Sequence, residues 1–333
     1  MSHYKLTAED EKTHQPTDSI NFNESVYVNG FEPERRFGGW MRMGNRINEG
    51  HAEAQVCLYL PDGRIACQFQ RPDISHNDGF AAGGMRYEVH EPLKKVSMHF
   101  EGELMVLDDP NLLRDPKKLF TQAERLPGKA SFKLTGVSPV HGGEPLTDSQ
   151  ETMYGRDFSF GHFFQHTRTV AHFEVGGEKW DLDSFGWRDH SWGPRYWTNI
   201  YFYRLLIANF GPDRSMMLLK ITGRDGVTRR HGVLQIDDQY EEITDMDIIT
   251  EWTAEKDPKT IHLGVRTAQR NALMEGRVIQ LAPLSNRRKV GDEVLKSRIA
   301  EGLTEWTWDG LKGIGVTEYI EFLENGEPVG YPL

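Results

Sequence analysis

The segment GWRDHSWGPR, residues 186–195, is followed after Tyr196 by WTNIYFYRLLIANF, residues 197–210. The second segment is long, aromatic and rich in branched aliphatic residues, which is typical of a β-strand. The first segment places two tryptophans beside an aspartate, a histidine and two arginines. Aromatic rings favour an apolar setting whereas charged groups need partners or water, so this mixture is expected where a carboxyl group works beside aromatic walls. Asp189 is therefore the first candidate for a functional residue.

Strand-like patterns dominate on both sides of this stretch. Residues 55–60 and 64–69 flank the turn Pro61-Asp62-Gly63, and if Leu60 pairs with Arg64, then Cys57 faces Cys67. Alternating or turn-linked segments at 96–104, 131–137, 163–175, 216–235 and 261–281 extend the pattern. The best helical patch of the first half, residues 111–125, is limited by Pro116. Short strands joined by Gly, Asn and Asp turns predict an all-β fold of the sandwich or barrel type, with few short helices.

A faint internal repeat favours two β domains. Gly39-Trp40-Met41-Arg42 leads into a hairpin with a Pro-Asp-Gly turn, and Arg195-Tyr196-Trp197 leads into a strand and a hairpin with an Arg-Asp-Gly turn. We expect residues 1–20 to form a flexible or draped N-terminal arm, residues 21–178 a first β domain and residues 179–333 a second. The boundary is expected near the turn Gly176-Gly177.

Composition narrows the class of protein. The chain has 333 residues, and 39 Lys and Arg against 50 Asp and Glu give a net charge of −11, so we expect no nucleic-acid partner. A hydrophobic content of 38% is enough to fill a core. The N-terminus is polar and no apolar run is long enough to span a bilayer, so we expect a cytoplasmic protein without stable membrane insertion.

One face of the segment 162–174 collects histidines. On an extended strand, alternate residues share a side, and that side would carry His162, Phe164, His166, Arg168, Val170, His172 and Glu174. It is either the solvent-facing side of a sheet or the polar lining of a barrel or cleft. His162 and His166 would lie about 13 Å apart on a strand, too far to share one ion, so we expect no metal site.

Other kinds of chemistry are weakly represented. The chain lacks a G-x-S-x-G nucleophile elbow and a glycine-rich phosphate loop that opens a helix, and we expect no cofactor. Acid–base work by carboxyl and imidazole groups remains. Asp189 is close in sequence to Trp187 and Trp192, and a carboxyl group held against indole rings is desolvated and able to donate a proton. The alternative is that Asp189 caps a turn or pairs with Arg188 or Arg195.

These segments resemble the carotenoid 1,2-hydratase and kievitone-hydratase superfamily, through GWRDHSWGPR, the strand YFYRLLIANF and the hairpin MMLLKITGRDG. The first half, with FNESVYVNG, GGWMRMGNR and NEGHAEAQVCLYLPDG, resembles its unassigned bacterial branch, so the resemblance covers most of the chain. It implies two lipocalin-like β domains packed together. Carotenoid hydratases are similar in placing an aspartate inside an aromatic cleft at this point, which here is Asp189, with Trp187 in place of a tyrosine. Residues 190–192 are where this chain departs from them.

The resemblance implies a cofactor-independent lyase. Such a hydratase or dehydratase would act by acid catalysis on a C=C bond or tertiary alcohol of a hydrophobic isoprenoid- or steroid-like molecule. Its catalytic residues would be Asp189 as the proton donor, with His190 or His166 holding the water. The substrate would lie against Trp187, Trp192, Trp197, Tyr201, Tyr203, Arg204 and His172. A cyclase, pericyclase or isomerase with the same apolar cleft, and a lipocalin-like carrier without catalysis, are the alternatives, and the chain could form a homodimer.

Overall fold

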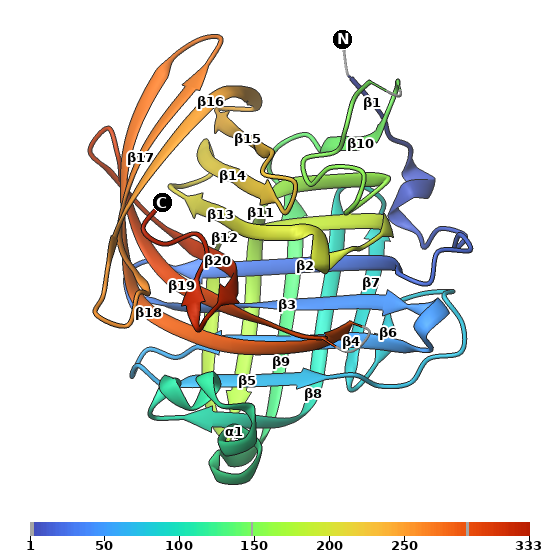
Figure 1. The fold of residues 1–333 in the computed structure, drawn as a ribbon, viewed down its shortest axis with the longest axis vertical. Helices are drawn as coiled ribbons and strands as arrows, with labels where there is room; N and C mark the ends of the chain where they lie inside the picture. The colour runs from blue at the N-terminus through green and yellow to red at the C-terminus, as the bar shows by residue number, and fades with distance from the viewer. Residues whose placement is uncertain (1–2, 148, 291–292) are drawn as a thin grey trace. The chain divides into compact units, whose positions relative to one another are not determined.

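The computed structural model describes residues 3–147, 149–290 and 293–333. The chain divides into two compact units, one formed by Met1–Val106 with Glu124–Tyr196 and the other by Leu107–Ala123 with Trp197–Leu333. Both are built from β-strands with only short helices, so the prediction of an all-β fold is confirmed (Figure 1). Among the described residues, no helix combines the length and the apolar character that crossing a bilayer would require.

Among its described residues, the first unit contains twelve strands and two short 3-10 helices. The helices are η1 (Ala8–Glu11) and η2 (Ile47–Glu49), and the strands are β1 (Tyr4–Lys5), β2 (Phe22–Glu32), β3 (Phe37–Arg46), β4 (His51–Tyr59), β5 (Ile65–Gln70), β6 (Ala81–Ala82), β7 (Met85–Glu91), β8 (Lys95–Leu107), β9 (Glu124–Gly136), β10 (His141–Pro145), β11 (Gly161–Val175) and β12 (Glu178–Pro194).

Hydrogen-bonded neighbours of the first unit follow one another as β11, β12, β2, β3, β4, β5, β8 and β9. Because β9 pairs with both β8 and β11, these strands form a closed ring. In Figure 1, β2 to β5 run across the direction of β8, β9 and β11. Closure leaves no free edge among the ring strands, which protects them against pairing with other chains.

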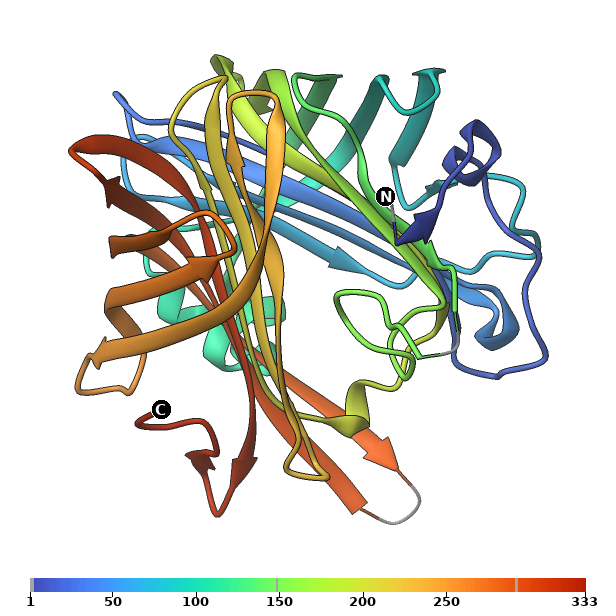
Figure 2. The ribbon, with the colours of Figure 1, turned by 90° about the horizontal axis from the view of Figure 1, so that it is seen from above.

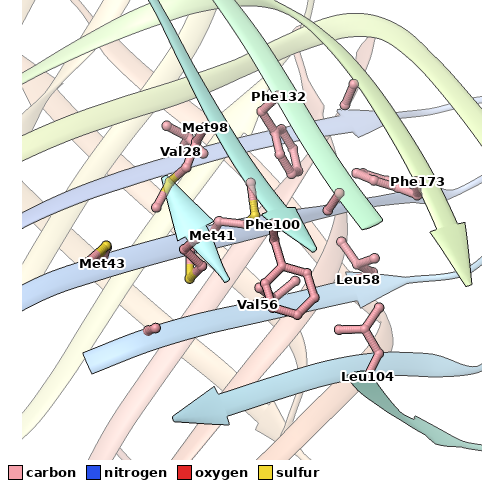
Figure 3. Packing of buried hydrophobic residues seen from close by; sticks show 14 of the residues in the cluster. Val28, Met41, Met43, Val56, Leu58, Met98, Phe100, Leu104, Phe132 and Phe173 are labelled. Carbon is pink, nitrogen blue, oxygen red and sulfur yellow. The ribbon is translucent and has the colours of Figure 1, made fainter. Parts of the chain in front are cut away.

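Alternate side chains of these strands meet in one hydrophobic core (Figure 3). On β8, the buried residues Val96, Met98 and Phe100 follow the period of two that the sequence predicted. The hairpin of β4 and β5 also has the predicted register, because the N–H of Leu60 donates to the carbonyl oxygen of Arg64, and Cys57 lies opposite Cys67. Burial of this apolar area, at about 25 cal/mol per Å², is the main stabilising contribution of the unit.

The second unit is a closed barrel. Its helices are η3 (Pro110–Arg114), α1 (Pro116–Gln122) and η4 (Trp197–Asn199), and its strands are β13 (Ile200–Asn209), β14 (Arg214–Gly223), β15 (Thr228–Ile236), β16 (Gln239–Trp252), β17 (Pro258–Thr267), β18 (Asn271–Val290), β19 (Glu293–Trp308), β20 (Leu311–Glu324) and β21 (Glu327–Pro328). Strands β13 to β20 pair in sequence order, and β13 also pairs with β20, which closes the barrel. Such up-and-down closure is the lipocalin-type arrangement.

Pro116 begins a helix rather than interrupting one. It is the first residue of α1, where a missing N–H costs nothing, and the carboxylate of Asp115 accepts hydrogen bonds from the N–H groups of Lys117 and Lys118. This helical excursion, although flanked by strands of the first unit, belongs to the second unit. There Arg114 forms an ion pair with Asp257.

The division between the units differs from the expected boundary after residue 178. It falls after Tyr196, because β12 pairs with β11 on one edge and with β2 on the other. The motif segment 186–194 is therefore a central strand of the first unit. A turn such as Gly176-Gly177 simply joins β11 to β12 within one sheet.

The N-terminal arm is draped over the first unit and fastened by a buried charge. Figure 2 shows this segment at one end of the unit, beside the hairpin of β6 and β7. The carboxylate of Glu11 accepts hydrogen bonds from Arg188 at 2.6 and 3.1 Å, from the hydroxyl of Tyr87 at 3.2 Å and from the N–H of Leu93 at 2.6 Å. The side chains of Glu11 and Arg188 are 0% and 2% exposed.

Replacing Glu11 by Gln should destabilise the first unit by about 3–5 kcal/mol, because the guanidinium of Arg188 would stay buried without a counter-charge. The matched control is Glu9→Gln in the same 3-10 helix, whose carboxylate is 77% exposed and pairs with Lys12. Urea unfolding, followed by tryptophan fluorescence, measures the stability of both variants. Equal midpoints for the two variants would show that the buried pair does not hold the arm.

Candidate functional site

Strands β11 and β12 carry the motif, and their register decides what its residues can reach. The register places three pairs of residues opposite one another, namely His162–Ser191, Phe164–Asp189 and His166–Trp187. Opposite residues of paired strands share a face, and successive residues change face. We call the side that carries Asp189 the aspartate face. The other side, which carries the hydrophobic core of the first unit, is the inner face.

An acid and an imidazole meet on the aspartate face. The Nε2 atom of His162 lies 3.8 Å from Oδ2 of Asp189, and the two side chains are 1% and 11% exposed. This Nε2 atom is buried and has no hydrogen-bond partner among the described residues. A buried polar atom without a partner costs free energy, so such an atom in a folded protein calls for a role.

Aromatic rings surround this pair within the first unit. The ring of Tyr154 lies 4.6 Å from that of His162, and the ring of Phe164 lies 5.5 Å from it. Phe164 in turn contacts Trp187 with centroids 5.7 Å apart, and Trp187 contacts His166 at 5.3 Å. Asp189 and His162 thus lie among rings that could contact an apolar molecule and stabilise a positive charge on it.

A buried arginine adds positive charge beside the acid. Arg195 donates hydrogen bonds to Oγ of Ser191 at 2.8 Å and to the carbonyl oxygen of Phe158 at 3.1 Å. Burial is the main cause that lowers the pKa of Arg195 to about 10, and the charges of Tyr154 and Asp189 act in the opposite direction. The charge of Asp189 therefore acts on the guanidinium of Arg195.

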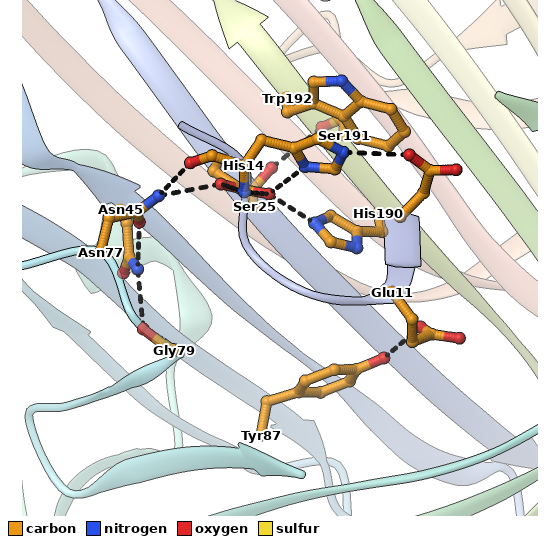
Figure 4. A network of polar contacts seen from close by, with 12 residues as sticks. Glu11, His14, Ser25, Asn45, Asn77, Gly79, Tyr87, His190, Ser191 and Trp192 are labelled. Atoms are coloured by element: carbon orange, nitrogen blue, oxygen red, sulfur yellow. Dashed lines mark hydrogen bonds and ion pairs between the residues drawn. The ribbon is translucent and has the colours of Figure 1, made fainter. Parts of the chain in front are cut away.

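The other sequence-predicted residues of the motif strands are divided between the faces. His166 shares the aspartate face, fully buried, with its ring against those of Phe185 and Trp187. His190 and Trp192 lie on the inner face, where His190 Nε2 is 3.0 Å from Oε1 of Glu24 (Figure 4). The alternation of β12 therefore separates His190 from Asp189.

His172 lies further along β11, away from the acid in register. Its Nδ1 atom is 2.8 Å from Oδ1 of Asp181, and its side chain is 42% exposed. The face on which the sequence gathered three histidines is thus buried at His162 and His166 and solvent-exposed toward His172.

Four of the predicted substrate-binding residues belong to the second unit. Trp197 begins η4, and Tyr201, Tyr203 and Arg204 follow on β13. Arg204 is buried, donates to Oε1 of Glu321 at 2.7 Å and lies 4.0 Å from the ring centroid of Tyr319. Its charge is therefore neutralised within the barrel. A cavity of about 440 Å³ near the end of β20 is lined by Phe322 and Leu323 among others, and none of the predicted residues lines it.

Two residues of the acid site were absent from the sequence-predicted set. The sequence places His162 on the histidine face. If β11 and β12 are taken to form a hairpin, His162 falls on the same face as Asp189, and this pairing is the signal that could have selected it. Tyr154 lies in the connection before β11, outside any strand. Its contact with His162 could not be predicted, because no repeating pattern of the sequence includes Tyr154.

The fold defines a class: a two-unit all-β protein of lipocalin-like architecture. The chain resembles the crystal structure of CghA with Sch210972, with a TM-score of 0.59 and 11% identity over 93% of this chain and 90% of that one. It also resembles kievitone hydratase from Nectria haematococca, with a TM-score of 0.53 and 9% identity over 96% of this chain and 97% of that one. The predicted resemblance is confirmed at the level of the fold.

The chain belongs to the family described as "Domain of unknown function (DUF7064)", which matches residues 7–322. A search of curated proteins gave no match. At the identities found, the solved structures establish a shared fold, and the chemistry must be argued from the site itself.

A second ionic cluster lies on the sheet beside the aspartate face. Glu53 of β4 accepts a hydrogen bond from Arg42 of β3 at 2.9 Å, and both side chains are 14% exposed. Burial alone would raise the pKa of Glu53, but the charges of Arg42 and Arg46 outweigh it and hold that pKa at about 2. A carboxyl group with a lowered pKa in the folded state stabilises that state above its ordinary pKa of 4.5, and the contribution is lost as pH falls toward 2.

Between pH 5 and pH 2 the free energy of unfolding of the native chain should therefore fall by on the order of 2 kcal/mol more than that of Glu53→Gln. At pH 7 the variant should be the less stable of the two, because Arg42 loses the negative charge with which it forms an ion pair. Denaturant titrations at stepped pH values test the difference, with Glu101→Gln, an exposed carboxylate paired with Lys129, as the control. If the free energy of unfolding fell by the same amount between pH 5 and pH 2 in the native chain and in Glu53→Gln, this assignment would be wrong.

Proposed function

We propose that this chain is a hydratase or dehydratase that moves protons with Asp189 and His162 on a hydrophobic small molecule. The observation that carries the proposal is the 3.8 Å approach of His162 Nε2 to Asp189 Oδ2 among aromatic rings. Proton transfer to an unactivated carbon needs a positioned acid, and the transfer of a proton away from water needs a base. One carboxyl group and one imidazole within reach of each other supply both.

The reaction balances with one proton shared by the pair. Asp189 gives its proton to the less substituted carbon of a double bond, and a tertiary cation forms at the other carbon. Water attacks the cation as His162 Nε2 takes the proton that the water loses, and this proton then passes from His162 to Asp189. The sum is alkene plus water to tertiary alcohol, and the reverse path is dehydration.

In this scheme the aromatic side chains stabilise the cation, and polar residues near Asp189 position the strand that carries it. The rings of Trp187 and Phe164 would stabilise the cation by cation–π attraction, worth about 2 kcal/mol where water is excluded. Arg195 and Ser191 would position the aspartate strand. His162 replaces His190 and His166 as the water-binding histidine, because His190 faces the opposite side and His166 is packed against Phe185 and Trp187.

An isoprenoid or steroid framework is the substrate class that we propose, since such molecules form tertiary cations and present apolar surface to aromatic walls. The relatives support a small organic substrate. One of them carries the name of a hydratase, and the other was crystallised with Sch210972.

Incubation of the purified chain with a panel of terpenoids and sterols in ¹⁸O-labelled water, followed by mass spectrometry, tests the proposal. We expect a product that gains or loses the mass of one water, with ¹⁸O incorporated on hydration. Asp189→Asn and His162→Gln should each lower the rate by about 10²–10⁴-fold while the melting profile stays unchanged. The control is Asp183→Asn on the same strand, whose carboxylate is 54% exposed and pairs with Arg168.

The alternatives give different results in the same experiment. A carrier would bind a panel member without forming any product, an isomerase would form one without label, and a cyclase would be slowed only mildly by Asp189→Asn. Each of these outcomes would overturn the hydratase proposal.

A further inference from the structure

Three metal-ligating side chains meet on the inner face of β12, opposite to the acid site. They are His14 of the N-terminal arm, Glu24 of β2 and His190 of β12, and one possible ligand atom from each lies within 4.8 Å of the others. The sequence separates them widely, so no spacing pattern could have revealed the set. Figure 4 shows His14 and His190 close to one another in the same network of polar contacts.

Glu24 lies at the centre of this cluster. Its Oε1 atom is 2.7 Å from His14 Nδ1 and 3.0 Å from His190 Nε2. Two ligands at about 2.1 Å from a tetrahedral zinc ion lie about 3.4 Å apart. To hold an ion, Oε1 of Glu24 would therefore move away from His14 Nδ1 by about 0.7 Å and from His190 Nε2 by about 0.4 Å, shifts that side-chain rotation can supply. Two imidazoles and one carboxylate are a ligand set that zinc and other divalent first-row metals accept.

The groups around the ligands have the arrangement of an outer shell. Asp10 Oδ1 lies 3.3 Å from His14 Nε2, which is the nitrogen that points away from the cluster. Asn77 donates to the second oxygen of Glu24 at 3.0 Å and is itself held by Asn45 at 2.9 Å. A carboxylate on the far nitrogen of a histidine fixes its tautomer, and such partners orient the ligands of metal sites.

Burial and access also suit an ion. The side chains of Glu24 and His190 are 0% exposed, whereas that of His14 is 20% exposed and stacks on Trp192 with centroids 3.9 Å apart. His14 is therefore both a ligand and the side of the cluster that solvent can reach. The three side chains would leave a coordination position for water or another small ligand.

We propose that His14, Glu24 and His190 bind one divalent transition-metal ion of the zinc class, which fastens the N-terminal arm to β2 and β12. This site lies on the inner face, away from Asp189 and His162, so it does not depend on the proposed hydratase chemistry.

The test uses the full chain after removal of metal with a chelator. Titration with Co²⁺, followed by its visible absorption, and with Zn²⁺, followed by calorimetry, should show one equivalent bound. The melting temperature of the first unit should rise with bound metal, because the ion binds the folded state alone. His14→Gln should weaken binding by more than the roughly 10–100-fold expected for Asp10→Asn, which removes only an outer partner.

His14 is the variant of choice because it lies on the arm and is partly exposed, whereas changes at Glu24 or His190 disturb buried groups. The control is His262→Gln, which alters an exposed histidine between Glu251 and Glu275 in the second unit. This variant should keep the full stoichiometry and affinity. The proposal is overturned if the native chain binds no metal, if His14→Gln binds as the native chain does, or if His262→Gln abolishes binding.

Discussion

The pairing of β12 with β11 along one edge and with β2 along the other is the constraint on which the rest of the first unit depends. Residues of a strand alternate between faces, so this register sends Asp189 to one side and Arg188 and His190 to the other. A shift of one residue would exchange the two sets and place the carboxylate of Asp189 in the hydrophobic core. The ring closure by β9 and the core beneath β12 hold the register, and thereby hold both polar sites.

Each face of β12 satisfies its buried charges in a different way. On the inner face, Glu11 meets Arg188 with supporting hydrogen bonds, and Glu24 meets two histidines. Burial would raise the pKa of Glu24, but hydrogen bonds and charges from His14 and His190 lower it to about 2. On the aspartate face, His162 Nε2 lacks a hydrogen bond among the described residues, and on the inner face the same is true of His190 Nδ1. Buried charges are tolerated where partners exist, and an incompletely satisfied site is where chemistry is expected.

The fold is shared with a hydratase and with a ligand-bound protein at about a tenth of identical residues. A fold of this kind tolerates such divergence, because many different sequences can place an apolar residue at every second position of a strand. It does not preserve a site, whose geometry depends on particular side chains. The proposed proton transfer therefore depends on Asp189 and His162 of this chain. The inner-face cluster of His14, Glu24 and His190 likewise rests on positions that the fold brings together.

Alternation of apolar residues and turn chemistry determined the all-β fold, the hairpin that sets Cys57 against Cys67, and the histidine face of β11, because these features are local. The composition of residues 186–195 also determined Asp189 as the acid to consider. Only the tertiary structure decided that His162, rather than His190, meets that acid, because this depends on the pairing of two strands. It alone moved the unit boundary to Tyr196, through the pairing of β12 with the distant β2. It alone brought His14 to Glu24 and His190, since contacts between residues far apart in sequence form when the chain closes its sheet and leave no periodic trace in the sequence.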